Sequence, residues 1–458
     1  MFKQFTTRGT EGAQGLRRTI VAGGLAFACA SGLAACGGDS GGSGGSSGGS
    51  EVKAAAASDP AVKALNDVFG PGGKEAGEGV TINNGMLLAM TGQGAYFGRV
   101  MSQGAKLAAS QVKAAGGPDF KISIGDHEDG AIQAGVAATR RMISQDKITT
   151  LQTSYGAVSE AIIPQIQQAK VLTFQGGGPS PGQVEKDFLW NNRMLFGDAP
   201  APGALTWLAK EHPDAKRLAI VGTSENATNA IKTLVPSVWP KVQDGGTIAT
   251  TQIHDVGVTD FGSVIAKIKA SKADAIWNAS FGNDPGYFVK AVRQAGIDIP
   301  IILSEFTSDA CKVDPKAMSS VHAAADYFDP NSENPLARSF TEAYRAAYKS
   351  DPDFYAANYY EQILIVWELV KRVIAEGGDP QDGAALQAAL IKDPKFPSLY
   401  GGDRSTPGEI VFDPTLHTVT KPMNVLEISG DCVPSPVADI TAVGPDADPK
   451  TALVSASR

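Results

Sequence analysis

The chain has 458 residues, of which 43% are hydrophobic and 19% are charged, and its net charge at pH 7 is −8. This length is enough for two domains with sizeable cores. The acidic balance argues against a nucleic-acid partner and against broad contact with anionic lipid, and after residue 50 no apolar run is long enough to cross a membrane.

The first predicted element is a targeting segment over residues 1–36. Two arginines precede an apolar stretch at 19–33, which is too short for a permanent membrane helix. The stretch ends in Leu-Ala-Ala-Cys, whose last residue is Cys36, and this run resembles the lipobox of bacterial lipoproteins. The resemblance implies that Cys36 carries a lipid and begins the mature chain. The alternative is an ordinary cleaved signal with an incidental cysteine.

A Gly/Ser-rich segment at 37–53 follows Cys36 and is typical of a flexible tether. A tether between a lipid and a folded body predicts an extracytoplasmic protein anchored to the cell membrane. The next segment, 54–79, is predicted to hold a short helix and a connection.

From residue 80 onward, short apolar runs alternate with amphipathic segments. The runs at 86–90, 120–124, 148–151 and 171–174 are typical of strands, and the segments at 103–115, 131–143 and 160–169 are typical of helices. A second series of similar size begins near residue 201. This alternation predicts parallel βαβ units, hence an α/β fold with two doubly wound parallel-sheet lobes joined by several crossings.

The predicted lobes are built from separate stretches of chain. We expect lobe 1 over 80–200 and lobe 2 over 201–327. Residues 328–400 carry two helices without strands between them and are expected to complete lobe 1. We expect a crossing and the final strand of lobe 2 in 401–440, and a C-terminal tail in 441–458.

Four short motifs occur in order along these lobes. Residues 91–98 read T-G-Q-G-A-Y-F-G, 114–117 read A-A-G-G, 260–269 fit D-F-x-x-x-I-x-x-I-K, and 293–296 read R-Q-A-G. In this order and spacing they resemble the branched-chain amino acid (leucine/isoleucine/valine) binding proteins of ABC transporters. The resemblance covers about 80–430 and implies a type I periplasmic binding fold with a ligand cleft between the lobes.

The same resemblance implies a function. The protein would capture a small organic solute, such as an amino acid, an amide, or a small or aromatic carboxylate, and deliver it to ABC permease and ATPase subunits. The alternative is a lipoprotein that signals ligand occupancy to a membrane receptor. We identify no G-x-S-x-G nucleophile elbow and the sequence has no H-E-x-x-H, so we expect no enzymatic activity, no cofactor, no metal and a monomer.

Ligands of open α/β sheets bind beyond the carboxyl ends of the strands, so loops after predicted strands hold the candidate ligand residues. In lobe 1 these are Tyr96, Phe97, Ser154, Tyr155, Gly156, Gly177 and Gly178. The resemblance implies that an aromatic ring at 96–97 contacts the ligand. It also implies that residues 154–156 hold the carboxylate of the ligand. Exposed N–H groups at 177–178 would add donors. The alternatives are aromatic packing within the lobe, simple N-capping and a plain turn.

In lobe 2 the candidates are Asn226, Phe281 and Glu305. The resemblance implies that Phe281 is an aromatic contact and that Glu305 pairs with a ligand ammonium group, whereas a salt bridge is the other reading of Glu305. The acidic run at 126–129, which contains His127, is interpreted as a solvated loop rather than a metal site.

The cysteines are few. Beyond Cys29 and Cys36 only Cys311 and Cys432 remain, and in an oxidising compartment they predict one disulfide. The alternative is two separate buried thiols.

Overall fold

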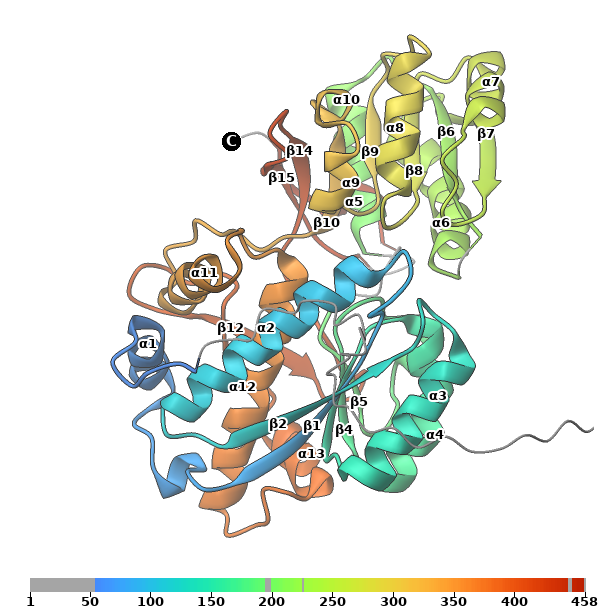
Figure 1. Ribbon diagram of the computed structural model, residues 1–458. Coiled ribbons are helices and arrows are strands. Elements are labelled where there is room, and N and C mark those ends of the chain that lie inside the picture. The colour runs from blue at the N-terminus through green and yellow to red at the C-terminus, as the bar shows by residue number, and fades with distance from the viewer. Residues whose placement is uncertain (1–53, 194–198, 225, 444–446, 457–458) are drawn as a thin grey trace, which may run out of the picture. The chain divides into compact units, whose positions relative to one another are not determined.

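Figure 1 shows the computed structural model, which describes residues 54–193, 199–224, 226–443 and 447–456, with the backbone alone for 226–231 and 456. The predicted signal segment, Cys36 and the tether lie outside the described residues. Among the residues that are described, no helix combines the length and the apolar character needed to span a bilayer.

Lobe 1 is built on an eight-stranded sheet in the order β11-β12-β13-β5-β4-β3-β1-β2. Strands β1 to β5 and β13 are parallel, and β12 and β11 extend one edge by antiparallel pairing. The strands are β1 (Thr81–Leu88), β2 (Asp119–Asp126), β3 (Thr150–Thr153), β4 (Leu172–Gln175), β5 (Leu189–Asn191), β11 (Lys395–Ser398), β12 (Gly408–Asp413) and β13 (Thr418–Val419).

Helices cover both faces of this sheet, which explains why adjacent residues such as Leu87 and Leu88 are both fully buried. The core on one face is packed by α1, α2, α11, α12 and α13, and the core on the other by α3, η2 and α4. The elements are α1 (Pro60–Phe69), η1 (Lys74–Ala76), α2 (Ala95–Ala114), α3 (Ile132–Arg141), η2 (Met142–Asp146), α4 (Gly156–Ala169), η3 (Pro181–Gln183), α11 (Pro335–Tyr348), α12 (Phe354–Ala375) and α13 (Gly383–Lys392).

Lobe 2 repeats this plan. Its sheet has the order β16-β15-β14-β10-β9-β8-β6-β7, with β6 to β10 parallel and β14 to β16 antiparallel. The elements are α5 (Pro200–Glu211), β6 (Arg217–Thr223), α6 (Asn226–Val242), β7 (Thr247–His254), α7 (Gly262–Ser271), β8 (Ala275–Ala279), α8 (Asp284–Gln294), β9 (Ile301–Leu303), α9 (Ser308–Lys312), α10 (Pro315–Met318), β10 (His322–Asp326), β14 (Met423–Ile428), β15 (Pro434–Ile440), η4 (Pro449–Ala452) and β16 (Leu453–Ala456).

The first five strands of both lobes therefore have the same spatial order, 2-1-3-4-5. In this arrangement the direction of winding reverses between the first and third strands, and ligands of doubly wound sheets bind at that switch point. The predicted fold class, two doubly wound α/β lobes, is confirmed.

The chain passes between the sheets three times, after β5, after β10 and after β13. Two predicted boundaries are wrong. Residues 408–419 form β12 and β13 of the lobe 1 sheet, so the crossing within 401–440 comes only at 420–422. The segment 441–458 is not a simple tail, because β16 pairs with β15 and completes the lobe 2 sheet. Two of the strands concerned, the two-residue β13 and the four-residue β16, are too short to show a periodicity of their own.

Buried charges mark the three crossings. Arg193, just after β5, donates to Asp326 at the end of β10, and both side chains are nearly fully buried. Lys421, in the third crossing, lies 2.7 Å from Glu361 of α12, and neither side chain has any exposed surface. The Lys421 ammonium also donates to Asn358. Each crossing is thus fixed by a buried ionic contact.

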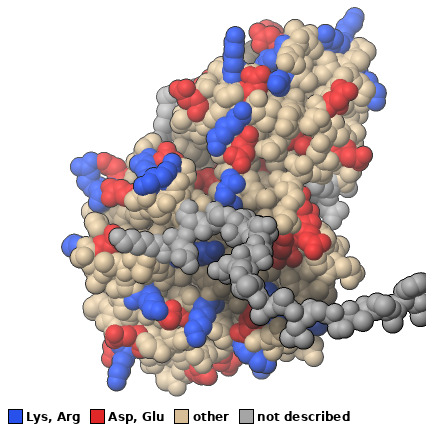
Figure 2. Space-filling view, in the orientation of Figure 1, with Lys and Arg blue, Asp and Glu red and all other residues tan. Residues whose placement is uncertain are grey.

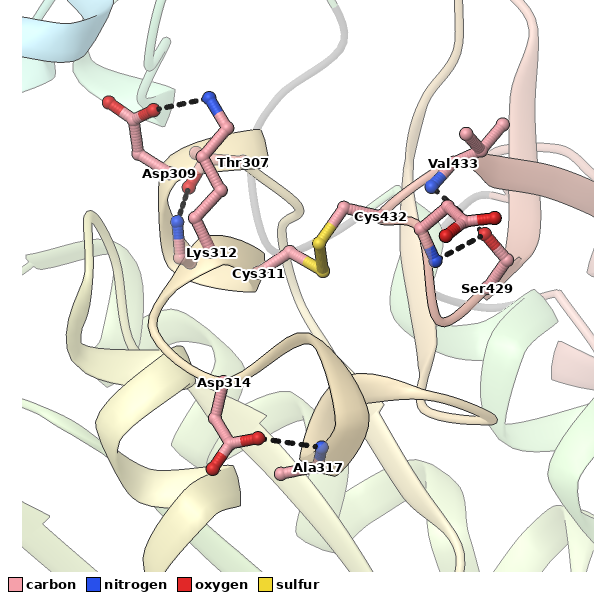
Figure 3. The surroundings of a disulfide bond; sticks show 11 residues. Thr307, Asp309, Cys311, Lys312, Asp314, Ala317, Ser429, Cys432 and Val433 are labelled. Atoms are coloured by element: carbon pink, nitrogen blue, oxygen red, sulfur yellow. Dashed lines mark hydrogen bonds and ion pairs between the residues drawn. A yellow bond between two sulfur atoms is a disulfide. The ribbon is translucent and has the colours of Figure 1, made fainter.

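The predicted disulfide is present. Cys311 of α9 is joined to Cys432, in the turn between β14 and β15, as Figure 3 shows. Both ends are held locally: Thr307 caps α9 by accepting from the Ala310 N–H, and the Cys432 N–H donates to the Ser429 carbonyl. The disulfide thus links α9, which follows the parallel strand β9, to the antiparallel strands β14 and β15 of lobe 2.

Candidate functional site

The carboxyl edges of the two sheets meet at the start of α2. Arg99 Nη2 of α2 lies 3.2 Å from Asp309 Oδ2 of α9 in lobe 2. A Cβ atom added to Gly257, in the loop after β7, would lie 3.5 Å from Gln93 Nε2. The loops that follow the parallel strands of both lobes, where the sequence places its candidates, thus converge on one region.

The two aromatic residues at the start of α2 have different roles. The helix begins at Ala95, eight residues earlier than predicted, so Tyr96 and Phe97 belong to its first turn rather than to a loop. Phe97 is 6% exposed and packs edge-to-face on Tyr355, with ring centroids 5.0 Å apart. Phe97 is therefore a core residue of lobe 1, which agrees with the alternative of aromatic packing within the lobe.

Tyr96 is only partly buried, and its hydroxyl donates to Asp353 Oδ2 at 2.6 Å. Asp353 is also the N-cap of α12, where its other oxygen accepts from the Ala356 N–H. Burial raises the pKa of Asp353, and burial together with the neighbouring Asp353 carboxylate holds the pKa of Tyr96 well above its usual value. The phenol therefore stays protonated, with the guanidinium of Arg99 5.3 Å from its ring centroid.

Ser154 and the residues that follow it stand at the switch point of lobe 1. Ser154 is fully buried, and its Oγ contacts His127 Nε2 at 3.0 Å and donates to the Leu87 carbonyl. It does not cap α4, whose N-cap, Tyr155, makes no side-chain capping bond. The first N–H groups of α4, beginning at Gly156, therefore have neither an intrahelical partner nor a side-chain cap, and such groups favour an anion.

Tyr155 is held from two sides. Its hydroxyl donates to Asp129 Oδ1 at 2.9 Å, and its ring packs on His127 with centroids 4.6 Å apart. Asp129 also accepts from the N–H groups of Gln93 and Gly94. A carboxylate in the loop after β2 thus links the loops after β1 and β3 into one unit.

The glycine loop after β4 lies against Ser154. Cβ atoms at Gly177 would come within 2.5 Å of the Ser154 carbonyl oxygen, so only glycine fits there. Its N–H donates to Gln175 Oε1, and the Gly178 N–H donates to the Ser154 carbonyl. Because both N–H groups have partners within the lobe, this loop provides close backbone approach rather than the donors that we expected.

In lobe 2 the predicted residues follow β8 and β9. Phe281 is half-buried and packs on the core formed with α5 and α6. Glu305 follows β9 and is only 6% exposed. Asn226 begins α6, and its side chain lies outside the described atoms.

Comparisons with known proteins agree with this architecture. The family model described as "Periplasmic binding protein" matches residues 81–432. The chain belongs to this family. A relative named Leu/Ile/Val-binding protein homolog 1, from Brucella suis, is 22% identical over 344 residues, which is 72% of this chain and 89% of the relative.

Solved binding proteins share the fold. The branched-chain amino acid binding protein LivJ of Streptococcus pneumoniae, in complex with isoleucine, is similar with a TM-score of 0.68 and 19% identity, covering 79% of this chain and 99% of LivJ. A solute-binding protein of R. palustris in complex with benzoate gives 0.67 and 19%, covering 80% and 98%. The three similar proteins named above are all described as binding proteins, not as enzymes.

Several residues that lie near the carboxyl edge of the lobe 1 sheet were not predicted from the sequence. Tyr355 and Arg193 lie beside Phe97 and the glycine loop, since Arg193 donates to the Gly177 carbonyl and to the Tyr355 hydroxyl. The interpretation of 126–129 as a solvated loop is wrong for His127, which is fully buried. Among the described residues no cluster of three or more His, Cys, Asp or Glu side chains could hold a metal.

Lysine and arginine are interspersed with aspartate and glutamate on the face that Figure 2 shows. The described part of this face has no continuous basic surface of the kind that binds a nucleic-acid backbone.

Proposed function

We propose that this protein is the extracytoplasmic solute-binding component of an ABC importer, and that it captures a small organic solute between its two lobes. The observation that carries the proposal is the 2-1-3-4-5 strand order of both sheets, together with the position of Gly257 and Gly282, in the loops after β7 and β8, next to Gln93 in the loop after β1. The lobes would close around the solute by a hinge motion of the three crossings. The protein itself would act by binding and would catalyse no reaction.

The residues at the two edges favour a ligand with an acidic end and an apolar body. The uncapped start of α4, at Gly156, would hold a carboxylate, while Tyr96 and Phe281 would contact the apolar part. LivJ is described with isoleucine and the R. palustris proteins with benzoates, so both classes are candidates here. Glu305 would separate them, because only an amino acid brings an ammonium group.

Glu305→Gln therefore tests the ligand class. A charge-assisted hydrogen bond contributes roughly 1.5–3 kcal/mol, which corresponds to a loss of about tenfold or more in affinity. If the solute is an amino acid, calorimetric titration of Glu305→Gln should show that weakening. For an aromatic acid the Kd should stay within about threefold.

The matched control is Glu427→Gln, on β14. The Glu427 side chain is exposed and lies away from the carboxyl edge of the sheet. The Kd of the Glu427→Gln variant for the solute should therefore equal that of the parent. An unchanged Kd for an amino acid that binds the parent tightly would contradict the ammonium-binding role of Glu305.

We also propose that Cys36 carries the lipid that anchors the protein and that the segment 37–53 is the tether. A Cys36→Ser variant should accumulate as an unprocessed precursor or be released from the membrane fraction, because the acceptor of the lipid is gone. Fractionation and gel mobility of the variant that equal those of the parent would contradict the anchor.

A further inference from the structure

The glycine loop after β4 is held by side chains that are bound at the chain crossings. The Gly177 carbonyl accepts from Nη1 of Arg193, which begins the first crossing. The Gly176 carbonyl accepts from Asn358 Nδ2 of α12 at 2.8 Å. The other amide atom of Asn358, Oδ1, accepts from Lys421 in the third crossing. The positions of two consecutive carbonyls in this loop therefore depend on the crossings.

The glycine loop in turn supports the start of α4. The Gly178 N–H donates to the Ser154 carbonyl at 2.6 Å. A Cβ atom added to Gly156, the first residue of α4, would lie 2.8 Å from the Gly178 carbonyl oxygen, so the loop packs closely against that helix end. A displaced glycine loop would leave both Ser154 and the start of α4 without these contacts.

Arg193 also contacts lobe 2. Its Nε donates to Asp326, the last residue of β10, and the Arg193 side chain is only 4% exposed. The same guanidinium lies 5.1 Å from the ring centroids of Phe354 and Tyr355, and its Nη1 donates to the Tyr355 hydroxyl at 3.1 Å. A guanidinium is planar, and the directions of its donors are fixed relative to one another. One rigid group thus joins a loop of lobe 1 to the last parallel strand of lobe 2.

These two contacts restrict how the lobes can be arranged. If the end of β10 moved with lobe 2 while the glycine loop stayed with lobe 1, the fixed donors of Arg193 could not follow both, and one contact would be lost. Whatever holds the glycine loop in place therefore favours the arrangement in which both contacts are made. A carboxylate bound at the start of α4 would hold the loop in this way, because the loop and α4 are in contact.

We propose that Arg193 is a positioning residue: it braces the glycine loop behind the start of α4 and couples solute binding there to the arrangement of the two lobes. The coupling rests on the proposed function, whereas the brace does not. Arg193 acts through the Gly177 carbonyl and through Asp326, without contacting the solute. By linkage, the lobe arrangement must affect solute affinity as much as the solute affects the arrangement.

The first experiment uses Arg193→Lys and needs no solute. The ammonium keeps a positive charge next to Asp326 but lacks the fork of donors that also reaches Gly177. Hydrogen exchange of the mature chain at 176–178 should accelerate about tenfold, which corresponds to the loss of a charge-assisted hydrogen bond. Exchange in β6 and β8 of lobe 2 should stay at the rate of the parent. Acceleration throughout both lobes would show a general loss of stability and would contradict the brace.

The matched control is Arg293→Lys. Arg293 of α8 also donates to two backbone carbonyls, those of Ile297 and Ile299, and its Nη1 lies 3.6 Å from Asp298 Oδ1. These contacts precede β9 and so lie at the amino end of the strand, away from the candidate site. This variant should leave both the exchange at 176–178 and the solute affinity unchanged.

The second experiment measures affinity and lobe arrangement with two probes, leucine and benzoate. For whichever probe binds the parent, the Kd should be at least tenfold weaker in Arg193→Lys. Small-angle scattering should show a change in the radius of gyration of the parent on saturation, and less than half of that change in saturated Arg193→Lys. A residue that only stabilises the fold would leave the change at saturation complete.

A second variant approaches the same link from lobe 2. Asp326→Asn keeps an oxygen that can accept from Arg193 Nε but removes the charge, so it should weaken the Kd about threefold or more and accelerate exchange at 176–178. It replaces Arg193→Lys if that variant does not fold.

The outcomes separate the inference from the proposed function. If neither probe nor any other small organic solute binds the parent, the proposed function fails and the coupling fails with it, while the exchange experiment still decides whether Arg193 braces the loop. Exchange at 176–178 that equals that of the parent in Arg193→Lys would overturn the brace. A complete change in the radius of gyration of saturated Arg193→Lys would overturn the coupling.

Discussion

Glu361→Ala should destabilise the protein by about 3–5 kcal/mol, which is the usual cost of removing one partner of a buried ion pair. Glu361 is fully buried and accepts from Lys421 Nζ at 2.7 Å, from Ser398 Oγ at 2.6 Å and from the Leu399 N–H. Its removal would leave the buried Lys421 ammonium without the carboxylate to which it is hydrogen-bonded. Denaturant unfolding of the mature chain measures the loss.

The pH dependence of the variant follows from Lys421. Burial already lowers the pKa of Lys421, against the attraction of Glu361. Without Glu361 that pKa falls further, so the unfolded chain binds more protons than the folded one, and the deficit should shrink as the pH rises toward 10. A deficit that grows with pH would contradict this explanation.

The matched control is the double variant Lys421→Met/Glu361→Gln. Removing both charges avoids an unpaired buried ion, so this variant should lose clearly less stability than Glu361→Ala. Equal losses would show that packing around α12, rather than the ion pair, carries the effect.

The second large effect concerns the disulfide. Cys311→Ser/Cys432→Ser should lose about 2–4 kcal/mol, because the bond closes a segment with a sequence separation of 121 residues. The chain-entropy model gives on the order of 4–5 kcal/mol for a loop of this length as an upper value. The loss should appear as a lower melting temperature and a lower denaturant midpoint.

Reduction of the parent provides the control for this variant. The parent treated with dithiothreitol should unfold at the same midpoint as the double serine variant, and reductant should leave the variant unchanged. A parent whose midpoint is insensitive to complete reduction, checked by thiol counting, would contradict a stabilising role for the bond.

The sequence predicts the parallel part of this fold well because strands buried on both faces form continuous apolar runs and amphipathic helices repeat every 3.6 residues. A lobe 2 strand is expected within 401–440 and β14 lies there, and the βαβ series of both lobes are in place. The two-residue β13 pairs only because β5 and β12 flank it, so no local pattern could reveal it.

Candidate residues in loops directly after strands could be predicted from the sequence. Contacts between residues far apart in the sequence could not. The sequence placed Tyr96, Ser154 and Glu305 near the carboxyl edges correctly. It could not show that Phe97 turns into the core, because that depends on where α2 begins. Nor could it pair Arg193 with Asp326, since 133 positions separate them and only the return of the chain at the crossings joins them.

The central claim, that the mature chain binds a small organic solute, is tested most directly by a thermal-shift titration. The panel should hold the branched-chain amino acids, their amides, benzoate and 4-hydroxybenzoate. A solute at about 100 times its Kd stabilises the native state by about 2.7 kcal/mol. We predict a saturable rise in melting temperature with at least one member of the panel, and no rise at any concentration with any amino acid, amide or aromatic acid would contradict the account.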